Sequence, residues 1–447
     1  MTNDELLRRS LAAIWHPCTQ MKQHSPALAA HESWLPLTPI ARGEGVWLTD
    51  CEGKRYLDAI SSWWVNLFGH CHPAINAALR DQLETLEHVL LAGFTHTPAV
   101  TLAERLSALT DGALGHCFFA SDGASATEIA LKMSVHAWRN RGRSEKCEFV
   151  CVAGGYHGET VGALAVTDVA IFRAAYAPLI RAAAVAPSPD ARQAAAGESA
   201  VDVARRAAAG LEAILADQHE RIAAFIVEPL IQCANGMAMY DPEYLRLARA
   251  LCDRYEVHLI CDEIAVGYGR TGTFFAHEQA GIRPDLLCLS KGISGGYLPL
   301  SVVLSSDAIY AAFWDDSTTR AFLHSHSYTG NALACRAALA TLDLFASQNT
   351  LAANRQLAQH IAQHLAPLGE HPQVRHLRQR GMIAAFDVVD SDPGFGRRFH
   401  REALARGLLL RPIGNTVYVM PPYLITENEC ALLGQGIGAA LRASLQP

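Results

Sequence analysis

Short apolar runs alternate with amphipathic stretches over residues 116–305, and this alternation limits the possible folds more than any other feature. The runs have the length of strands, and the stretches between them are long enough for helices. Such alternation is typical of a mainly parallel sheet flanked by helices, in which functional side chains gather at the carboxyl ends of the strands. We therefore predict an α/β fold. The expected strands are 116–119, 149–152, 223–227, 258–261, 286–289 and 301–304.

The chain is longer than a single hydrophobic core usually supports. It has 447 residues, of which half are hydrophobic, so we expect one large domain with a smaller α+β companion. The expected parts are an N-terminal segment of the small domain over 1–65, the large domain over 66–345 and the C-terminal small domain over 346–447.

Charge and composition favour a soluble enzyme of small-molecule chemistry. The net charge is −7, both signs are scattered, and no basic patch suggests nucleic acid or an anionic membrane as a partner. The N-terminus is charged where a signal peptide would be apolar, and no long uncharged apolar run occurs. We therefore expect a cytoplasmic protein without a membrane or nucleic-acid partner.

The cysteines and histidines do not predict a metal site. The 12 cysteines are scattered without a CxxC pair, so neither zinc nor a disulfide framework is expected. His70-Cys71-His72 and His324-Ser325-His326 resemble ligand clusters, but neither has the further ligands that zinc requires. We expect no metal.

A charged residue follows each of two expected strands: Asp262 comes after 258–261, and Lys291 comes after 286–289. An Asp after a strand is usually a turn cap, and a lone Lys is usually solvated. Together they are what pyridoxal phosphate requires: an acid for the pyridinium nitrogen and an amine that forms an imine. Gly292, Gly295 and Gly296 add a loop that a ligand can approach closely. We predict that Asp262 and Lys291 are catalytic, together with Tyr156.

Two further motifs follow expected strands. Ser121–Ser125 opens an amphipathic helix, whose free N–H groups can bind phosphate, although a plain helix cap explains the same letters. Gly155-Tyr156-His157-Gly158 follows the strand at 149–152. Tyr156 can stack on the pyridine ring and wall the substrate pocket, or it can be a turn residue packed for structural reasons. Glu228 lies near the same edge.

The chain resembles the class III aminotransferases of fold type I over nearly its full length. The strongest motif is LICDEIAVGYGRTGTFFAHEQAGIRPDLLCLSKGISGG. The resemblance implies pyridoxal 5′-phosphate as cofactor, a large domain with a mainly parallel sheet, a smaller α+β domain, and a homodimer with shared active sites. The cofactor contacts that it implies are Gly123 and Ala124 at the phosphate, Tyr156 on the ring, Asp262, Lys291, His326, and Ser327 of the partner subunit.

Four segments resemble the members of this class that aminate 8-amino-7-oxononanoate in biotin synthesis. They are Ile14–Pro17, Ser61–Trp64, Gly154–Gly158, and Arg411–Pro412 followed by Tyr418–Tyr423. A keto acid with a long aliphatic body suits aromatic walls and a guanidinium that grips the distant carboxylate. Taken singly, a Trp pair is more often core, and an Arg is more often in a surface ion pair. The expected substrate contacts are Trp63, Trp64, Tyr156, Lys291, Ser325 and Arg411.

The substrate assignment leaves alternatives. The resemblance implies S-adenosylmethionine as the amino donor, with lysine as the alternative. Three departures from the class bear on this choice: Cys18 stands where the class often has Tyr, Tyr297 is bulky, and His326-Ser327 replaces a Pro-Thr pair. Another ω-aminotransferase would use ornithine or 4-aminobutyrate with 2-oxoglutarate. An aminomutase of the same fold would have no second substrate. A non-catalytic cofactor-binding protein would not require both Asp262 and Lys291.

Overall fold

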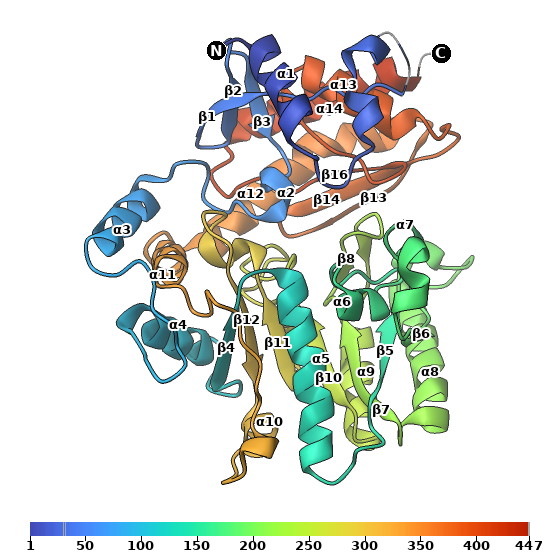
Figure 1. Ribbon diagram of the computed structural model, residues 1–447. Coiled ribbons are helices and arrows are strands. Elements are labelled where there is room, and N and C mark those ends of the chain that lie inside the picture. The colour runs from blue at the N-terminus through green and yellow to red at the C-terminus, as the bar shows by residue number, and fades with distance from the viewer. Residues whose placement is uncertain (30, 32, 446–447) are drawn as a thin grey trace. The chain divides into compact units, whose positions relative to one another are not determined.

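The computed structural model describes residues 1–29, 31 and 33–445 (Figure 1). The chain forms two compact units, one made of Met1–Pro73 with Ala352–Pro447 and the other of Ala74–Leu351. Each unit has its own sheets and its own buried side chains. The domain limits expected at 65/66 and 345/346 stay predictions.

A seven-stranded sheet forms the centre of the Ala74–Leu351 unit, with strand order β4-β12-β11-β10-β7-β5-β6. Of these strands, β12 alone runs antiparallel to its neighbours, so the sheet is mixed but mainly parallel. The predicted α/β class is confirmed. The strands are β4 (His116–Ala120), β5 (Glu148–Val152), β6 (Ala184–Ala186), β7 (Ile222–Val227), β10 (His258–Asp262), β11 (Leu286–Leu289) and β12 (Ser301–Ser305).

Helix α5 packs across β7, β10, β11 and β12, and Figure 1 shows it running along one face of the sheet. Its buried side is rich in small residues, which let the helix approach the strands closely. The helices of this unit are α3 (Pro73–Leu83), α4 (Thr97–Ala108), α5 (Gly123–Asn140), α6 (Val161–Ala165), α7 (Ala170–Arg173), α8 (Ala200–Gln218), α9 (Glu243–Arg254), α10 (Asp307–Ala311) and α11 (Ala332–Ser347), and a short hairpin is made by β8 (Ile231–Gln232) and β9 (Ala238–Met239).

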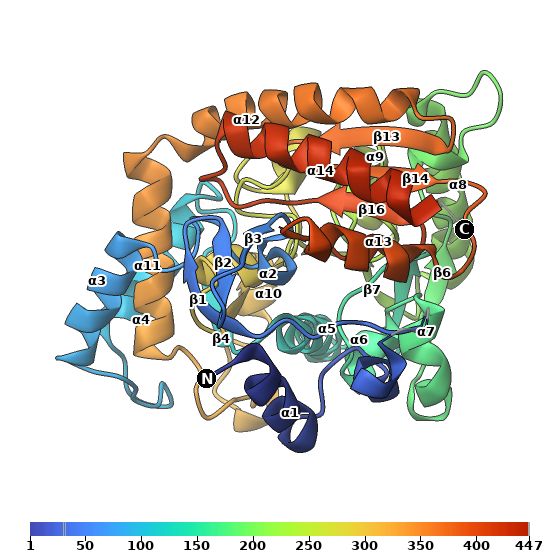
Figure 2. The ribbon, with the colours of Figure 1, turned by 90° about the horizontal axis from the view of Figure 1, so that it is seen from above.

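The other unit combines the two ends of the chain. Strand β3 pairs with β15, so N-terminal and C-terminal residues share one sheet, and β13, β14 and β16 form a second sheet. Helices α13 and α14 run side by side (Figure 2). The elements are α1 (Asn3–Ala13), β1 (Ile40–Glu44), β2 (Trp47–Asp50), β3 (Arg55–Asp58), α2 (Ser61–Trp64), α12 (Thr350–Leu365), β13 (Val374–Arg380), β14 (Ile383–Val388), α13 (Phe395–Ala405), β15 (Leu408–Leu409), β16 (Thr416–Val419) and α14 (Glu427–Leu445).

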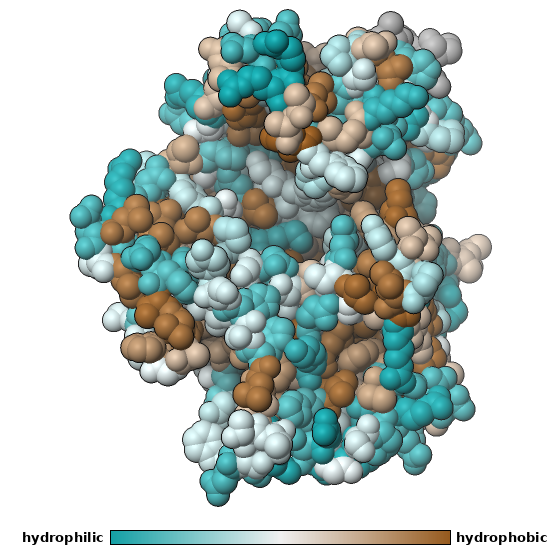
Figure 3. All heavy atoms as spheres, in the orientation of Figure 1, coloured by the Kyte–Doolittle hydropathy of each residue, from teal (hydrophilic) through white to brown (hydrophobic). Residues whose placement is uncertain are grey.

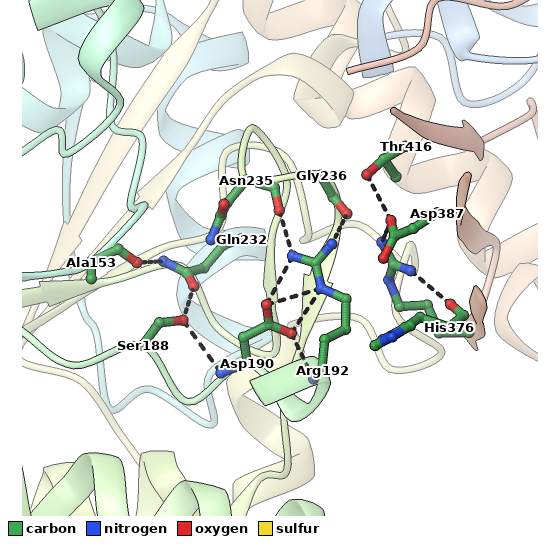
Figure 4. Close-up of polar contacts among 11 residues, drawn as sticks. Ala153, Ser188, Asp190, Arg192, Gln232, Asn235, Gly236, His376, Asp387 and Thr416 are labelled. Atoms are coloured by element: carbon green, nitrogen blue, oxygen red, sulfur yellow. Dashed lines mark hydrogen bonds and ion pairs between the residues drawn. The ribbon is translucent and has the colours of Figure 1, made fainter. Parts of the chain in front are cut away.

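Polar networks hold loops in place within each unit (Figure 4). In the unit of the large sheet, Arg192 pairs with Asp190 and donates from Nη2 to the carbonyl of Asn235, at 3.0 Å. Gln232 joins the same region to the chain after β5, because its amide group donates to the carbonyl of Ala153. In the other unit, Asp387 accepts a hydrogen bond from the hydroxyl of Thr416.

Apolar side chains gather over α6 and α7 in Figure 3. In this region Val161 and Leu179 are exposed, and with Leu323 they line a cavity of about 830 Å³ beside α5. Exposed apolar patches of this kind commonly mark binding surfaces. Within the described part of the chain, no helix combines the length and the apolar character that crossing a membrane requires.

Lys146 is a fully buried cation that ties three segments together just before β5. Its Nζ donates to the carbonyls of His219 at 2.7 Å, Ile222 at 3.1 Å and Glu256 at 2.7 Å. The ammonium also lies 4.7 Å from the centre of the Trp138 ring. Burial lowers the pKa of Lys146 to about 8. The three bonds compensate for the cost of burying the charge.

We predict that Lys146→Met lowers the stability of the protein. The methionine fills the space but leaves three buried carbonyls without a donor, at a cost of about 2–4 kcal/mol. Thermal unfolding followed by circular dichroism measures the loss. Lys22→Met, at an exposed position, is the matched control. Equal melting temperatures for the two variants would contradict a stabilising role for Lys146.

Candidate active site

Three ionisable side chains lie at the carboxyl edge of neighbouring parallel strands. Asp262 is the last residue of β10, Glu228 directly follows β7, and Lys291 comes shortly after β11. The register pairs Cys261 with Val227 and Asp262 with Cys288, so the three strands end at the same level. The structure therefore brings Asp262 and Lys291 to one edge of the sheet, as the parallel arrangement requires.

Asp262 is a buried carboxylate, 4% exposed, with a specific partner for each oxygen. Its Oδ1 accepts the backbone N–H of Ile264 at 3.0 Å, and its Oδ2 lies 2.7 Å from Nδ1 of His157. His157 is itself buried, and its Nε2 has no hydrogen-bond partner among the described residues. The chain after β5 thus supplies a direct partner for the acid at the end of β10.

The position of His157 is set by two threonines. Its backbone N–H donates to the hydroxyl of Thr167 at 3.0 Å, and its carbonyl accepts from the hydroxyl of Thr127 at 2.9 Å. A Cβ at Gly155 would meet the ring at Nε2, 3.3 Å away, and the carbonyl of Val152 at 2.9 Å. A side chain at position 155 would therefore clash with the backbone of Val152 and crowd the imidazole.

Lys291 is a half-buried amine that stands on a strained backbone. Its φ is +43°, which is unfavourable for a residue with a side chain and is typical of functional sites. Burial lowers the pKa of Lys291, while Asp262, Cys233 and Glu228 oppose this shift. A lowered pKa increases the fraction of neutral, nucleophilic amine at neutral pH.

Glu228 fixes the backbone that carries Tyr156. Its Oε2 accepts the N–H of Tyr156 and its Oε1 accepts the N–H of Cys233, each at 3.0 Å. Burial raises the pKa of Glu228 to about 7, and the negative charge of Asp262 adds to the rise. His157 acts in the opposite direction. The sequence predicted that Glu228 lies near this edge of the sheet. The structure shows that its carboxylate holds the backbone of Tyr156 and Cys233.

Tyr156 is half-buried, with its ring at the same edge. Its hydroxyl donates to Oε1 of Glu159 at 2.9 Å, and its ring centre lies 5.4 Å from that of Phe172. This arrangement leaves the ring supported on one side by another aromatic side chain. The Tyr156 ring can therefore form an aromatic wall of a binding pocket.

Helix α5 starts beside these residues with unused donors. Asp122 caps the helix by accepting the N–H of Ser125 at 2.9 Å, whereas the N–H groups of Gly123 and Ala124 have no partner among the hydrogen bonds of the described residues. Close packing restricts the site: a Cβ at Gly123 would lie 3.0 Å from Ile264, and one at Gly158, where φ is +118°, would lie 2.5 Å from the Cβ of Ala124. The helix N-terminus can hold an anion.

Ser325, His326 and Ser327 lie in a loop on the surface of the same unit. Both serines are exposed and His326 is half-buried. His326 Nε2 lies 3.0 Å from Nε2 of His324, and the carbonyl of Ser327 lies 2.9 Å from Nε2 of His88. These contacts leave the hydroxyl of Ser325 and the hydroxyl of Ser327 accessible to solvent. The contribution of the loop to a site stays a prediction.

The predicted substrate residues Trp63 and Arg411 meet in the other unit. The guanidinium of Arg411 lies 4.7 Å from the centre of the Trp63 ring, and Trp63 is 43% exposed. Nη2 of Arg411 donates a hydrogen bond to the carbonyl of Cys18 at 2.9 Å. Both side chains line a cavity of about 500 Å³. Trp64 differs, because it is only 5% exposed and its indole N–H donates to the hydroxyl of Tyr418 at 3.1 Å.

Sequence reasoning missed two partners of the expected site residues. His157 stood in a quoted motif without a role, and Asp58, which binds the turn that carries Trp63, was not considered. A signal for His157 was available, because β5 and β10 both deliver their following residues to one edge of a parallel sheet. Asp58 gave no such signal, because its role depends on an unusual backbone conformation. Among the described residues, no group of three or more His, Cys, Asp or Glu side chains could hold a metal ion.

Comparisons with known proteins show which family the chain is similar to. The family model described as Aminotransferase class-III matches residues 28–441. The adenosylmethionine-8-amino-7-oxononanoate aminotransferase of Helicobacter pylori is 45% identical over 434 residues, which cover 95% of each chain.

Solved structures extend the similarity to the fold. The crystal structure of adenosylmethionine-8-amino-7-oxononanoate aminotransferase from Methanocaldococcus jannaschii has a TM-score of 0.90 and 33% identity, covering 98% of this chain and 99% of that one. The PLP-bound amine transaminase from an uncultivated Pseudomonas species has a TM-score of 0.89 and 30% identity, covering 96% and 99%. The fold implied by the resemblance is confirmed. These matches establish that the chain belongs to the class-III aminotransferase family.

Proposed function

We propose that this protein transfers an amino group to 8-amino-7-oxononanoate in biotin synthesis, with pyridoxal 5′-phosphate as cofactor and S-adenosylmethionine or lysine as donor. The observation that carries the choice of substrate is the 45% identity, over 95% of both chains, to an adenosylmethionine-8-amino-7-oxononanoate aminotransferase. The pairing of Arg411 with an exposed Trp63 supports it, because this pair suits a long keto acid that ends in a carboxylate.

The residues at the strand edge fit pyridoxal phosphate. Asp262 is an acid held by His157, and Lys291 is an amine whose pKa is lowered. The free N–H groups of Gly123 and Ala124 suit the phosphate. Tyr156 would lie against the ring, and Asp262 would face the pyridine nitrogen. Nε2 of His157 is buried without a hydrogen-bond partner among the described residues, so this cluster can still form a hydrogen bond to a bound group.

Bound pyridoxal phosphate would supply the electron sink that makes the substrate's Cα–H acidic. Lys291 would take that proton with its neutral Nζ as a general base, and would give it back as a general acid to the carbon on the other side of the transferred nitrogen. Asp262 would keep a positive charge on the pyridine nitrogen, and His157 would hold the carboxylate in place. The donor and the keto acid would react in turn, in a ping-pong sequence.

Each substrate residue would have a distinct task. Arg411 would bind the distant carboxylate of the keto acid, and Trp63 and Tyr156 would wall its aliphatic body. Trp64, which is buried and bonded to Tyr418, would support this wall from behind. The exposed Ser325 would contact substrate.

A second copy of the chain would complete the site. The exposed hydroxyl of Ser327 and the apolar surface of Val161, Leu179 and Leu323 support a homodimer in which Ser327 of the partner subunit binds the phosphate and His326 contributes to the cofactor site. We place the enzyme in the cytoplasm, where soluble biosynthetic enzymes act. Light scattering of the purified protein would give twice the mass of one chain.

The proposed function is tested by two half-reactions followed through the absorbance of the cofactor. We expect S-adenosylmethionine or lysine to convert the cofactor to its amine form, and 8-amino-7-oxononanoate to restore it. Ornithine and 4-aminobutyrate, with 2-oxoglutarate as acceptor, are the comparison substrates. If only the comparison substrates react, the enzyme is another ω-aminotransferase. A spectrum that no amine changes would indicate cofactor binding without catalysis.

We predict that Asp262→Asn lowers kcat by a factor of about 100 or more, because the electron sink loses its counter-ion. The asparagine can keep the bond from the N–H of Ile264, so the strand end stays folded. Steady-state kinetics with the preferred donor measure the loss, and far-ultraviolet circular dichroism checks the fold. Full activity in a folded variant would exclude the proposed role of Asp262.

We predict a pH-dependent difference in stability between wild type and Glu228→Gln. The pKa of Glu228 is about 7 in the folded protein and near 4.5 when exposed, so the folded state binds the extra proton between these values. Stability from this proton is present at low pH and is lost as pH rises from about 4.5 to 7, by roughly 2–3 kcal/mol.

Melting temperatures of the cofactor-free proteins check this prediction. As pH rises through the window, wild type should lose stability relative to Glu228→Gln, whose amide does not titrate. Glu104→Gln, at an exposed site, is the control and should follow wild type. A constant difference between Glu228→Gln and wild type would show that the pKa of Glu228 is not raised.

A further inference from the structure

The turn that carries Trp63 has a left-handed backbone. Four consecutive residues of α2 have positive φ: 52° at Ser61, 46° at Ser62, 72° at Trp63 and 74° at Trp64. None of them is glycine, and in each the Cβ crowds the following carbonyl. Single residues of this kind occur in turns, but a run of four persists only where the surroundings enforce it.

Asp58 enforces this conformation from the end of β3. Its carboxylate is fully buried, and Oδ1 accepts the N–H of Ser62 at 2.8 Å while Oδ2 accepts the hydroxyl of Ser62 at 2.7 Å. Oδ2 also lies 2.9 Å from Nε2 of His70. Two bonds from one carboxylate to Ser62 therefore fix the middle of the turn.

Other contacts hold His70 and the ends of the turn. His70 exchanges backbone hydrogen bonds with Gly45 and packs so closely on β1 that a Cβ at Gly43 would lie 2.7 Å from it. The hydroxyl of Ser61 donates to the carbonyl of Met420 at 2.7 Å, and the indole of Trp64 is bonded to Tyr418. Both ends of the turn are buried, and Trp63 is its exposed aromatic residue.

The turn fixed by Asp58 presents Trp63 to a cavity that two arginines line, Arg397 and Arg411. Besides these arginines, the side chains lining this cavity include His16, His24 and His400, and none of the described lining residues is an Asp or Glu. Stacking on the Trp63 ring restricts Arg411 to one side of the cavity. The cavity therefore suits an anionic group on an apolar chain.

We propose that Asp58 is a positioning residue for the carboxylate end of the acceptor, acting through the left-handed turn and Trp63 to aim Arg411. This inference rests on the proposed function, since it assumes that the acceptor carries such a carboxylate. Asp58 itself is not among the residues that line the cavity, and its side chain contacts Ser62 and His70. It would contribute to KM for the acceptor and leave the chemical step unchanged.

The first test compares Asp58→Asn with wild type in the holoenzyme. The amide cannot accept both bonds from Ser62 and the bond from His70, so the turn loosens. We expect KM for 8-amino-7-oxononanoate to rise about tenfold or more, with kcat changed less than about twofold. KM for the terminal amide of the same acceptor should stay unchanged, because it has no carboxylate to bind. Asp4→Asn, an exposed change of the same chemistry in the same unit, is the control.

Two further variants separate positioning from general damage. Glycine adopts left-handed φ without steric cost, so Ser62→Gly added to Asp58→Asn should restore most of the lost affinity. In a Trp63→Ala background, Asp58→Asn should have little further effect on KM, because the side chain through which it acts is gone.

The outcomes distinguish this inference from the proposed function. If wild type does not use 8-amino-7-oxononanoate, the proposed function fails. If wild type uses it and Asp58→Asn lowers kcat alone, or raises KM for acid and amide equally, the positioning role is wrong. Additive effects of Asp58→Asn and Trp63→Ala on KM would also contradict it.

Discussion

The hydrogen bond between Asp262 and His157 is the interaction on which the site depends. A carboxylate buried at the end of a strand is costly unless it is paired and hydrogen-bonded, and His157 provides the partner from the chain after β5. The imidazole reaches this position because Thr127 and Thr167 hold its backbone and Gly155 has no side chain. The acid is thus positioned before any cofactor binds.

Glu228 and Lys291 belong to the same electrostatic unit. Burial acts in the same sense on both, since it favours the neutral form and so raises the pKa of Glu228 and lowers that of Lys291. The two residues follow strands on either side of β10. A site that combines the Asp262 carboxylate with a carboxyl of raised pKa and an amine of lowered pKa is suited to moving a proton near neutral pH.

Much of this arrangement could be predicted from the sequence. The alternation of apolar runs predicts the mainly parallel sheet, and parallel strands bring the residues that follow them to one edge. Asp262 and Lys291 could therefore be paired without a structure. The contact of His157 with Asp262 and the hold of Glu228 on the Tyr156 backbone depend on side-chain packing, which periodicity does not describe. The left-handed turn at Ser61–Trp64 runs against local preference, so only the surrounding contacts reveal it.

The most direct measurement is the nitrogen-15 chemical shift of the pyridine nitrogen in protein loaded with labelled pyridoxal phosphate. If Asp262, held by His157, faces this nitrogen, the shift will be that of a protonated pyridinium and will become that of a neutral pyridine in Asp262→Asn. A neutral pyridine in wild type would contradict the account, because the buried carboxylate would then have no charge to stabilise.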